Sequence, residues 1–140
     1  MAAAAPIVST GSDVARAVLR EVARLLDALA HDPMLDETVD LHSLPLSEPD
    51  REGLRQRLGR GEVEAVFNLA GPTRVTETAY AGVWWVRHAD ADADDRSVLE
   101  QIVVARVPAL LLAHPDDIAT ASHRLAAELE TPITEETLDD

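Results

Sequence analysis

Four strand-like segments follow one another closely between residues 62 and 107. They span 62–69, 73–80, 83–88 and 98–107. Two neighbouring parallel strands need a crossover connection of about a dozen residues or more, so connections as short as Gly82 predict antiparallel neighbours. We therefore expect a meander in which each strand pairs with the next.

Periodic apolar residues predict a long helix before this meander. The apolar positions recur at steps of four and three, namely at Val14, Val18, Val22, Leu25 and Leu29. Ser12 is placed to cap this helix, with Asp13 in its first turn, and Pro33 follows its expected end. A further strand is expected over 38–42, where polar and apolar residues alternate.

Two further regions of the chain are expected to be helical. Ser47 and Asp50 have the spacing of a variant capping box, which predicts a second helix through Leu58. Pro108 predicts a short helix, and a final helix is expected after His114. Its inward-facing residues are expected to be Ile118, Leu125 and Leu129.

These elements predict an α+β fold. We expect a mostly antiparallel sheet of about five strands, with the long N-terminal helix and the C-terminal helices packed on it. Residues 13–130 form a single domain in this interpretation, between a flexible lead at 1–12 and an acidic, disordered tail at 131–140.

Composition excludes several classes of function. The 140 residues carry a formal net charge of −14, and all 12 basic residues are arginine. Such a chain repels phosphate backbones and anionic membranes, so neither nucleic acid nor a membrane is expected as a partner. Cysteine is absent, which excludes disulfides and thiolate ligands within the chain. Residues 1–12 lack the pattern of a secretory signal, and the longest apolar run, 107–113, is too short to cross a bilayer, so a cytoplasmic protein is expected.

No motif indicates catalysis or metal binding. The sequence has no nucleophile elbow, no phosphate-binding loop and no dinucleotide fingerprint, so we expect no catalytic residues and no cofactor. The five histidines show no metal-ligand spacing; they are His31, His42, His88, His114 and His123. The aspartates at 90, 92 and 94 resemble a calcium loop, but the required glycine and glutamate are missing at the sixth and twelfth positions.

Two groups of residues suggest contact surfaces. Arg16, Arg20 and Arg24 form a ridge on the first helix, either a solvent-facing stripe or a basic contact strip. Trp84 and Trp85 are adjacent on a strand and must point to opposite faces of the sheet. Either both rings are core, or one is exposed as an anchor for a partner.

Residues 77–86, with the sequence ETAYAGVWWV, resemble the core signature of the HupH/HyaF family of hydrogenase expression/formation proteins. Three flanking stretches are similar too and occur in the same order, at 39–46, 59–63 and 106–118. Together the similarity runs from about residue 14 to residue 129. In this family the region is the C-terminal conserved domain of longer proteins.

The resemblance implies a non-enzymatic accessory role in the maturation of a nickel–iron uptake hydrogenase. It implies as partners the iron–sulfur small subunit or its precursor, before assembly, and other maturation factors. The expected contact region surrounds Glu77, Trp84, Trp85 and Arg87. An exposed edge strand would allow a homodimer or the addition of a partner strand.

Two alternative functions remain open. One is an acidic interaction or regulatory module unrelated to hydrogenase. The other is a small hydrolase or isomerase that uses Glu77, His88 or Asp40, which a deep pocket with a carboxylate beside a histidine would support.

Overall fold

The computed structural model describes residues 12–68, 71–89 and 98–131. Most of the predicted lead and tail, residues 69–70 and the aspartates at 90, 92 and 94 therefore lie outside the described residues. The elements in chain order are α1 (Asp13–His31), β1 (Asp36–Asp40), α2 (Glu48–Leu58), β2 (Glu64–Asn68), β3 (Pro72–Glu77), β4 (Val83–His88), β5 (Leu99–Ala105) and α3 (Pro115–Leu129). Short 3₁₀ turns lie at Leu41–Ser43 and Ala109–Leu111. The chain divides into two compact units, Met1–Pro108 and Ala109–Asp140.

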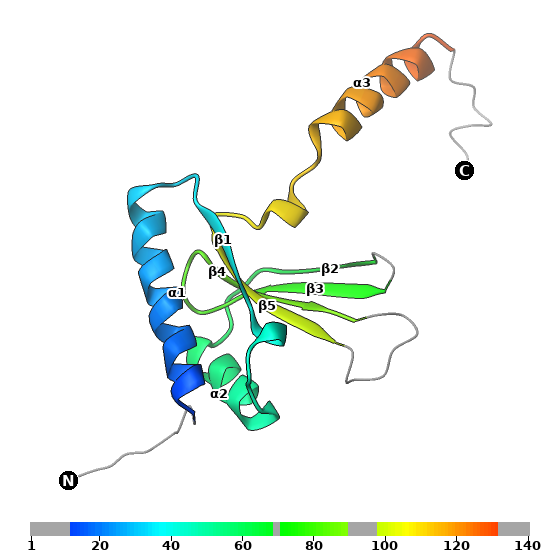
Figure 1. Cartoon of the computed structure of the whole chain (residues 1–140). Coiled ribbons are helices and arrows are strands. Elements are labelled where there is room, and N and C mark those ends of the chain that lie inside the picture. The colour runs from blue at the N-terminus through cyan, green and yellow to red at the C-terminus, as the bar shows by residue number, and fades with distance from the viewer. Residues whose placement is uncertain (1–11, 69–70, 90–97, 132–140) are drawn as a thin grey trace. The chain divides into compact units, whose positions relative to one another are not determined.

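The first unit is built on a five-stranded sheet in the order β1-β5-β4-β3-β2. Every neighbouring pair of strands is antiparallel. β2, β3, β4 and β5 form the predicted meander, and β1 adds to its far edge beside β5 (Figure 1). The α+β class and the antiparallel sheet predicted from the sequence are confirmed.

Both helices of this unit contribute to one core on one face of the sheet. Val83 and Trp85 of β4 and Ile102 and Val104 of β5 alternate along their strands and join this core. α1 contributes Ala15, Val18, Val22, Leu25 and Leu29, and the segment from the end of β1 through α2 contributes Leu41, Leu46, Leu54 and Leu58. We call this side of the sheet the helix-facing side.

The two helices begin at one shared carboxylate. Ser47 and Asp50 form the predicted capping box of α2: the Ser47 hydroxyl accepts the Asp50 N–H, and Asp50 Oδ2 accepts the Ser47 N–H at 3.0 Å. Asp50 Oδ1 also accepts the N–H of Ser12, the N-cap of α1, at 3.2 Å. The first four backbone N–H groups of a helix lack partners within the helix. Asp50 accepts one such N–H at the start of each helix and so stabilises both N-termini.

The second unit contains α3, which begins at the predicted position. His114 caps it, with Nδ1 accepting the N–H of Asp116 at 3.1 Å. Within this unit α3 has no buried side chain, although Ile118, Leu125 and Leu129 were expected to face inward. In the described part of this unit, 109–131, α3 is accompanied by one 3₁₀ turn and no other helix, so its packing on the sheet stays a prediction. No helix in the described part of the chain is long and apolar enough to span a membrane.

Candidate functional site

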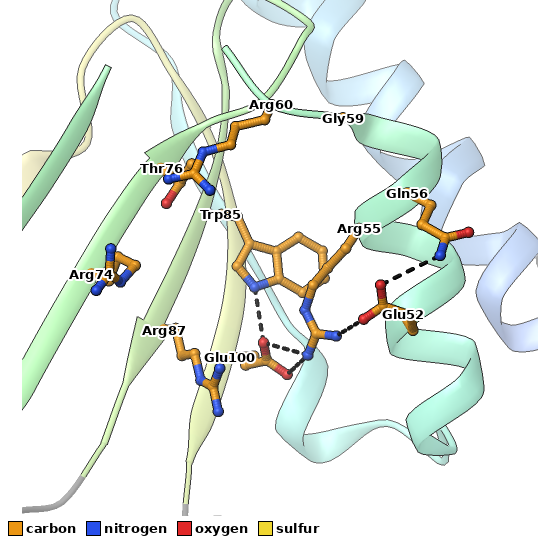
Figure 2. A pocket seen from close by; sticks show the side chains of 10 residues that line it. All are labelled: Glu52, Arg55, Gln56, Gly59, Arg60, Arg74, Thr76, Trp85, Arg87 and Glu100. Carbon is orange, nitrogen blue, oxygen red and sulfur yellow. Dashed lines mark hydrogen bonds and ion pairs between the residues drawn. The ribbon is translucent and has the colours of Figure 1, made fainter. Parts of the chain in front are cut away.

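A pocket of about 410 Å³ lies between α2 and the helix-facing side of β3, β4 and β5. Arg55 and Gln56 reach it from α2, Trp85 and Arg87 from β4, and Glu100 from β5 (Figure 2). The hydrophobic core ends here, because Arg87 and Glu100 occupy helix-facing positions that are apolar further along the same strands. We call this space the α2 pocket.

Glu100 is the centre of the hydrogen bonds in the α2 pocket. Its carboxylate accepts two bonds from Arg55 Nη2, at 3.0 Å and 2.9 Å, and one from Trp85 Nε1 at 3.0 Å. The Arg55 guanidinium also lies over the Trp85 ring, 5.4 Å from its centroid. Glu100 is only 5% exposed, so this satisfied network compensates for burying its charge.

The surroundings of Arg55 hold it in the charged form. Burial opposes that charge, but hydrogen bonds and ion pairs with Glu100 and Glu52 outweigh the burial and raise the pKa of Arg55. Arg55 Nη1 bonds Glu52 at 2.7 Å and approaches Glu48 at 3.5 Å. The donors of this arginine are therefore largely used within the chain.

A second carboxylate is shared by two arginines beside the pocket. Glu64 Oε2 of β2 accepts Arg60 Nη2 at 2.6 Å and Arg74 Nη1 at 2.8 Å. The hydrogen bond from Arg74 and the charges of both arginines lower the pKa of Glu64. Arg60 and Arg74 also line the pocket, so the Glu64 carboxylate connects two of the lining arginines.

Arg87 differs from the other arginines of the pocket. It is exposed, and it makes no ion pair or side-chain hydrogen bond with any residue in the described ranges. In the pairing of β3 with β4 it stands directly opposite Arg74, and in the pairing of β4 with β5 it stands opposite Glu100, which is bonded to Arg55 and Trp85. Like charges at such cross-strand positions destabilise a sheet. A second hollow, of about 760 Å³, also reaches Arg87, and its other charged lining residues are Arg51, Arg55, Glu48, Glu52 and Glu100.

The structure divides the four predicted contact residues between the two faces of the sheet. Trp85 and Arg87 lie on the helix-facing side, whereas Glu77 and Trp84 form a cross-strand pair on the other side. Trp84 is 6% and Trp85 8% exposed, so both rings are core and neither is an exposed anchor. Trp84 Nε1 donates to the carbonyl of Ala105 at 3.0 Å. A partner contact at this region stays a prediction, carried by Arg87 and the half-buried Glu77.

The residues considered for a hydrolase or isomerase lie apart. In the β3–β4 register, His88 pairs with Thr73 and Glu77 pairs with Trp84, four positions away, a separation of about 13 Å at the usual rise of a strand. Asp40 lies on β1 and accepts the N–H of His42 at 3.0 Å. The His88 ring is hydrogen-bonded to the Thr73 hydroxyl. The structure thus brings none of these carboxylates beside His88.

Other sequence candidates show ordinary surface roles. Arg24 of the arginine ridge pairs with Glu21 on the exposed face of α1 at 2.6 Å, which lowers the pKa of Glu21. Within the described part of the chain, no three histidines or carboxylates gather in a way that could hold a metal ion.

Sequence reasoning missed the partnership of Arg55 and Glu100. A signal was present, because Glu100 stands in the same alternating row as Ile102 and Val104, where a strand against a core normally has an apolar residue. A charged residue in that row indicates a buried partner. The sequence does not identify that partner, because which residue reaches Glu100 depends on how α2 crosses the sheet.

Comparison with known proteins places this chain in a family. Residues 14–131 match the model of the C-terminal conserved region of HupH hydrogenase expression protein. The chain is 34% identical over 87 residues to the hydrogenase expression/formation protein HoxQ of Azotobacter vinelandii, covering 62% of this chain and 30% of that protein. It is 28% identical over 89 residues to the hydrogenase-1 operon protein HyaF of Escherichia coli K12, covering 64% of this chain and 30% of that protein.

A solved structure is similar in fold as well as sequence. The hydrogenase expression protein HupH from Thiobacillus denitrificans ATCC 25259 superposes with a TM-score of 0.76 at 38% identity, covering 85% of this chain and 97% of that one. The match spans about a third of the length of the curated relatives. The chain belongs to the HupH family of hydrogenase expression proteins, and what it shares with them is their C-terminal conserved region.

Proposed function

We propose that the chain is a non-enzymatic accessory protein in the maturation of a nickel–iron hydrogenase, and that it binds the iron–sulfur small subunit or its precursor before assembly. The observation that carries this proposal is the family match over residues 14–131 together with the hydrogenase expression/formation names of the relatives. The finer statement, that the small subunit is the client, rests on the family resemblance.

The electrostatics of the chain suit such a role. A net charge of −14 keeps free copies apart and speeds the encounter with a basic surface on a client. Arg87 lies on the exposed surface of the same sheet that carries the family signature, which makes it a contact residue in this proposal. The two buried tryptophans then act by holding β4 in place.

Affinity purification tests the proposal directly. We expect the tagged chain, purified from cells that express the hydrogenase, to retain the small subunit, with the unprocessed form enriched in cells grown in air. Bound proteins are identified by mass spectrometry, and cells without the hydrogenase genes provide the background.

A matched pair of variants sharpens this test. Arg87→Gln is expected to reduce recovery of the small subunit, whereas Arg20→Gln, which removes the same charge from the exposed face of α1, is not. Recovery of other proteins with no hydrogenase subunit or maturation factor would contradict the proposed function.

A further inference from the structure

The α2 pocket is a positively charged site on a strongly negative chain. Four arginines line it against two glutamates, although the whole chain carries −14. Both lining glutamates bond Arg55, and Glu64 pairs with Arg60 and Arg74, which leaves Arg87 as the lining arginine without an ion pair in the described part of the chain. Charged groups gathered in a hollow attract ions of the opposite sign more strongly than the net charge of the protein suggests.

The chain itself shows how one carboxylate is bound at this site. Glu64 lies between Arg60 and Arg74 and accepts from both, at 2.6 Å and 2.8 Å. Guanidinium groups favour carboxylates because their planar forks match the two oxygens. Arg74 and Arg87 form the next arginine pair along the same side of the sheet, and no carboxylate of the described residues bonds both of them.

We propose that the α2 pocket binds a carboxylate of a polypeptide partner, held between Arg74 and Arg87. The incoming group would relieve the repulsion between these opposed arginines, as Glu64 does for Arg60 and Arg74. The inference goes beyond the hydrogenase role, because it concerns this pocket whichever protein supplies the carboxylate.

The shape of the site favours a polypeptide over a small free acid. The 410 Å³ pocket and the 760 Å³ hollow share Glu52, Arg55, Arg87 and Glu100, so they adjoin along the sheet-facing side of α2. Arg87 lies where the two spaces meet. Together they offer room on both sides of a bound carboxylate for the chain that carries it, which a lone small acid would leave unfilled.

Arginine side-chain NMR tests this binding. The chain has 12 arginines and no lysine, so a ¹⁵N-arginine sample of the whole protein gives a small, readable set of Nε–Hε signals. Loss of one signal in Arg74→Gln and in Arg87→Gln assigns the two residues. The probe is N-acetyl-Gly-Glu-Gly-amide, added at low ionic strength. We expect saturable shifts of the Arg74 and Arg87 signals.

Variants show whether the guanidinium fork matters. Loss of one charge-assisted hydrogen-bond partner should weaken binding about tenfold in Arg87→Gln. Arg20→Gln, with the same change of net charge on exposed α1, should keep the wild-type affinity. Because Arg87 is exposed and makes no ion pair among the described residues, its removal should leave the fold intact, and the backbone amide spectrum of the variant checks this. Arg87→Lys keeps the charge without the planar guanidinium fork, so its affinity for the peptide should lie between those of Arg87→Gln and the wild type.

Three outcomes would overturn the proposal. The first is the absence of a saturable shift with the glutamate peptide, or an equal shift with the matching glutamine peptide. The second is an equal loss of affinity in Arg20→Gln, which would assign the effect to net charge. The third is binding of sodium acetate or inorganic phosphate as tight as that of the peptide, which would assign the pocket to small anions. A lost hydrogenase interaction in the purification experiment changes none of these readings.

Discussion

Arg55 of α2 and Glu100 of β5 form a two-bond ion pair between residues 45 positions apart in the chain, with Arg55 Nη2 at 3.0 Å and 2.9 Å from the two carboxylate oxygens. The pair joins α2, which borders the pocket, to the sheet beneath it. It also fixes the Trp85 indole from two sides, through the Glu100 carboxylate and the Arg55 guanidinium. The shape of the pocket therefore depends on this contact.

Glu100→Gln should destabilise the protein by about 1–3 kcal/mol, because Arg55 would keep its charge in a half-buried place without its main partner. The amide oxygen can still accept from Trp85. Urea unfolding, followed by circular dichroism, measures the change in free energy of unfolding.

Glu52→Gln is the matched control for this change. Glu52 also bonds Arg55, but its side chain is 55% exposed, so removal of its charge should cost no more than about 0.5 kcal/mol. Equal effects of the two substitutions would show that the Glu100 pair is no stronger than a surface ion pair.

Trp84→Ala and Trp85→Ala should each cost about 3–5 kcal/mol, because each ring fills a buried site on its own face of the sheet. The milder changes to phenylalanine lose one indole hydrogen bond each and should cost about 1–2 kcal/mol. Thermal unfolding of the four variants checks this order. Tyr80→Phe, at an exposed aromatic residue, should stay within about 0.5 kcal/mol of the wild type.

The tryptophan result bears on how contact surfaces are tested. A weakened partner interaction in either alanine variant would reflect loss of the sheet, since neither ring is exposed. If instead either variant kept wild-type stability, its ring would not be part of the core.

Local patterns explain why so much of the fold could be predicted. The Ser12 and Ser47 caps depend on neighbouring residues alone, and β4 has its predicted bounds, 83–88. The strand expected over 38–42 lies instead at Asp36–Asp40. The Asp40 side chain accepts the His42 N–H and starts a 3₁₀ turn, which ends the strand early.

Contacts between distant segments explain what could not be predicted. Nothing local places β1 beside β5, because its pairing depends on the far edge of a sheet formed later in the chain. The α2 pocket has the same origin: the sequence singles out Arg87 as a contact residue but does not connect it with Arg74, and only the register of β3 and β4 sets the two opposite each other. Patterns within a strand also left open whether Trp84 or Trp85 was covered, since this depends on what packs on each face.

Asp50→Asn should destabilise the protein at neutral pH and matter less in acid. Hydrogen bonds from the Ser47 backbone, with help from Ser12, hold the pKa of Asp50 below its ordinary value of 3.8. A carboxyl group whose pKa is lower in the folded state stabilises that state above the unfolded pKa, and this contribution is lost as pH falls through the folded pKa. Urea unfolding of both proteins at neutral and acidic pH measures the difference.

Ser47→Ala separates the cap from the charge. It should cost about 1 kcal/mol through loss of the hydroxyl that accepts the Asp50 N–H, while Asp50 keeps both of its backbone donors. A difference between wild type and Asp50→Asn that does not shrink in acid would mean that the carboxylate charge has no part in starting the two helices.

Gly82→Ala and Gly53→Ala should change stability in opposite directions. Gly82 precedes β4 with φ at +89°, and an added Cβ would lie 2.8 Å from Leu29 Cδ2 of α1. The left-handed backbone and this crowding should together cost about 1–3 kcal/mol. Gly53 lies inside α2, where alanine should stabilise the helix by up to about 1 kcal/mol. Paired urea titrations test both signs, and a neutral Gly82→Ala would show that the turn before β4 and its contact with α1 can shift without loss.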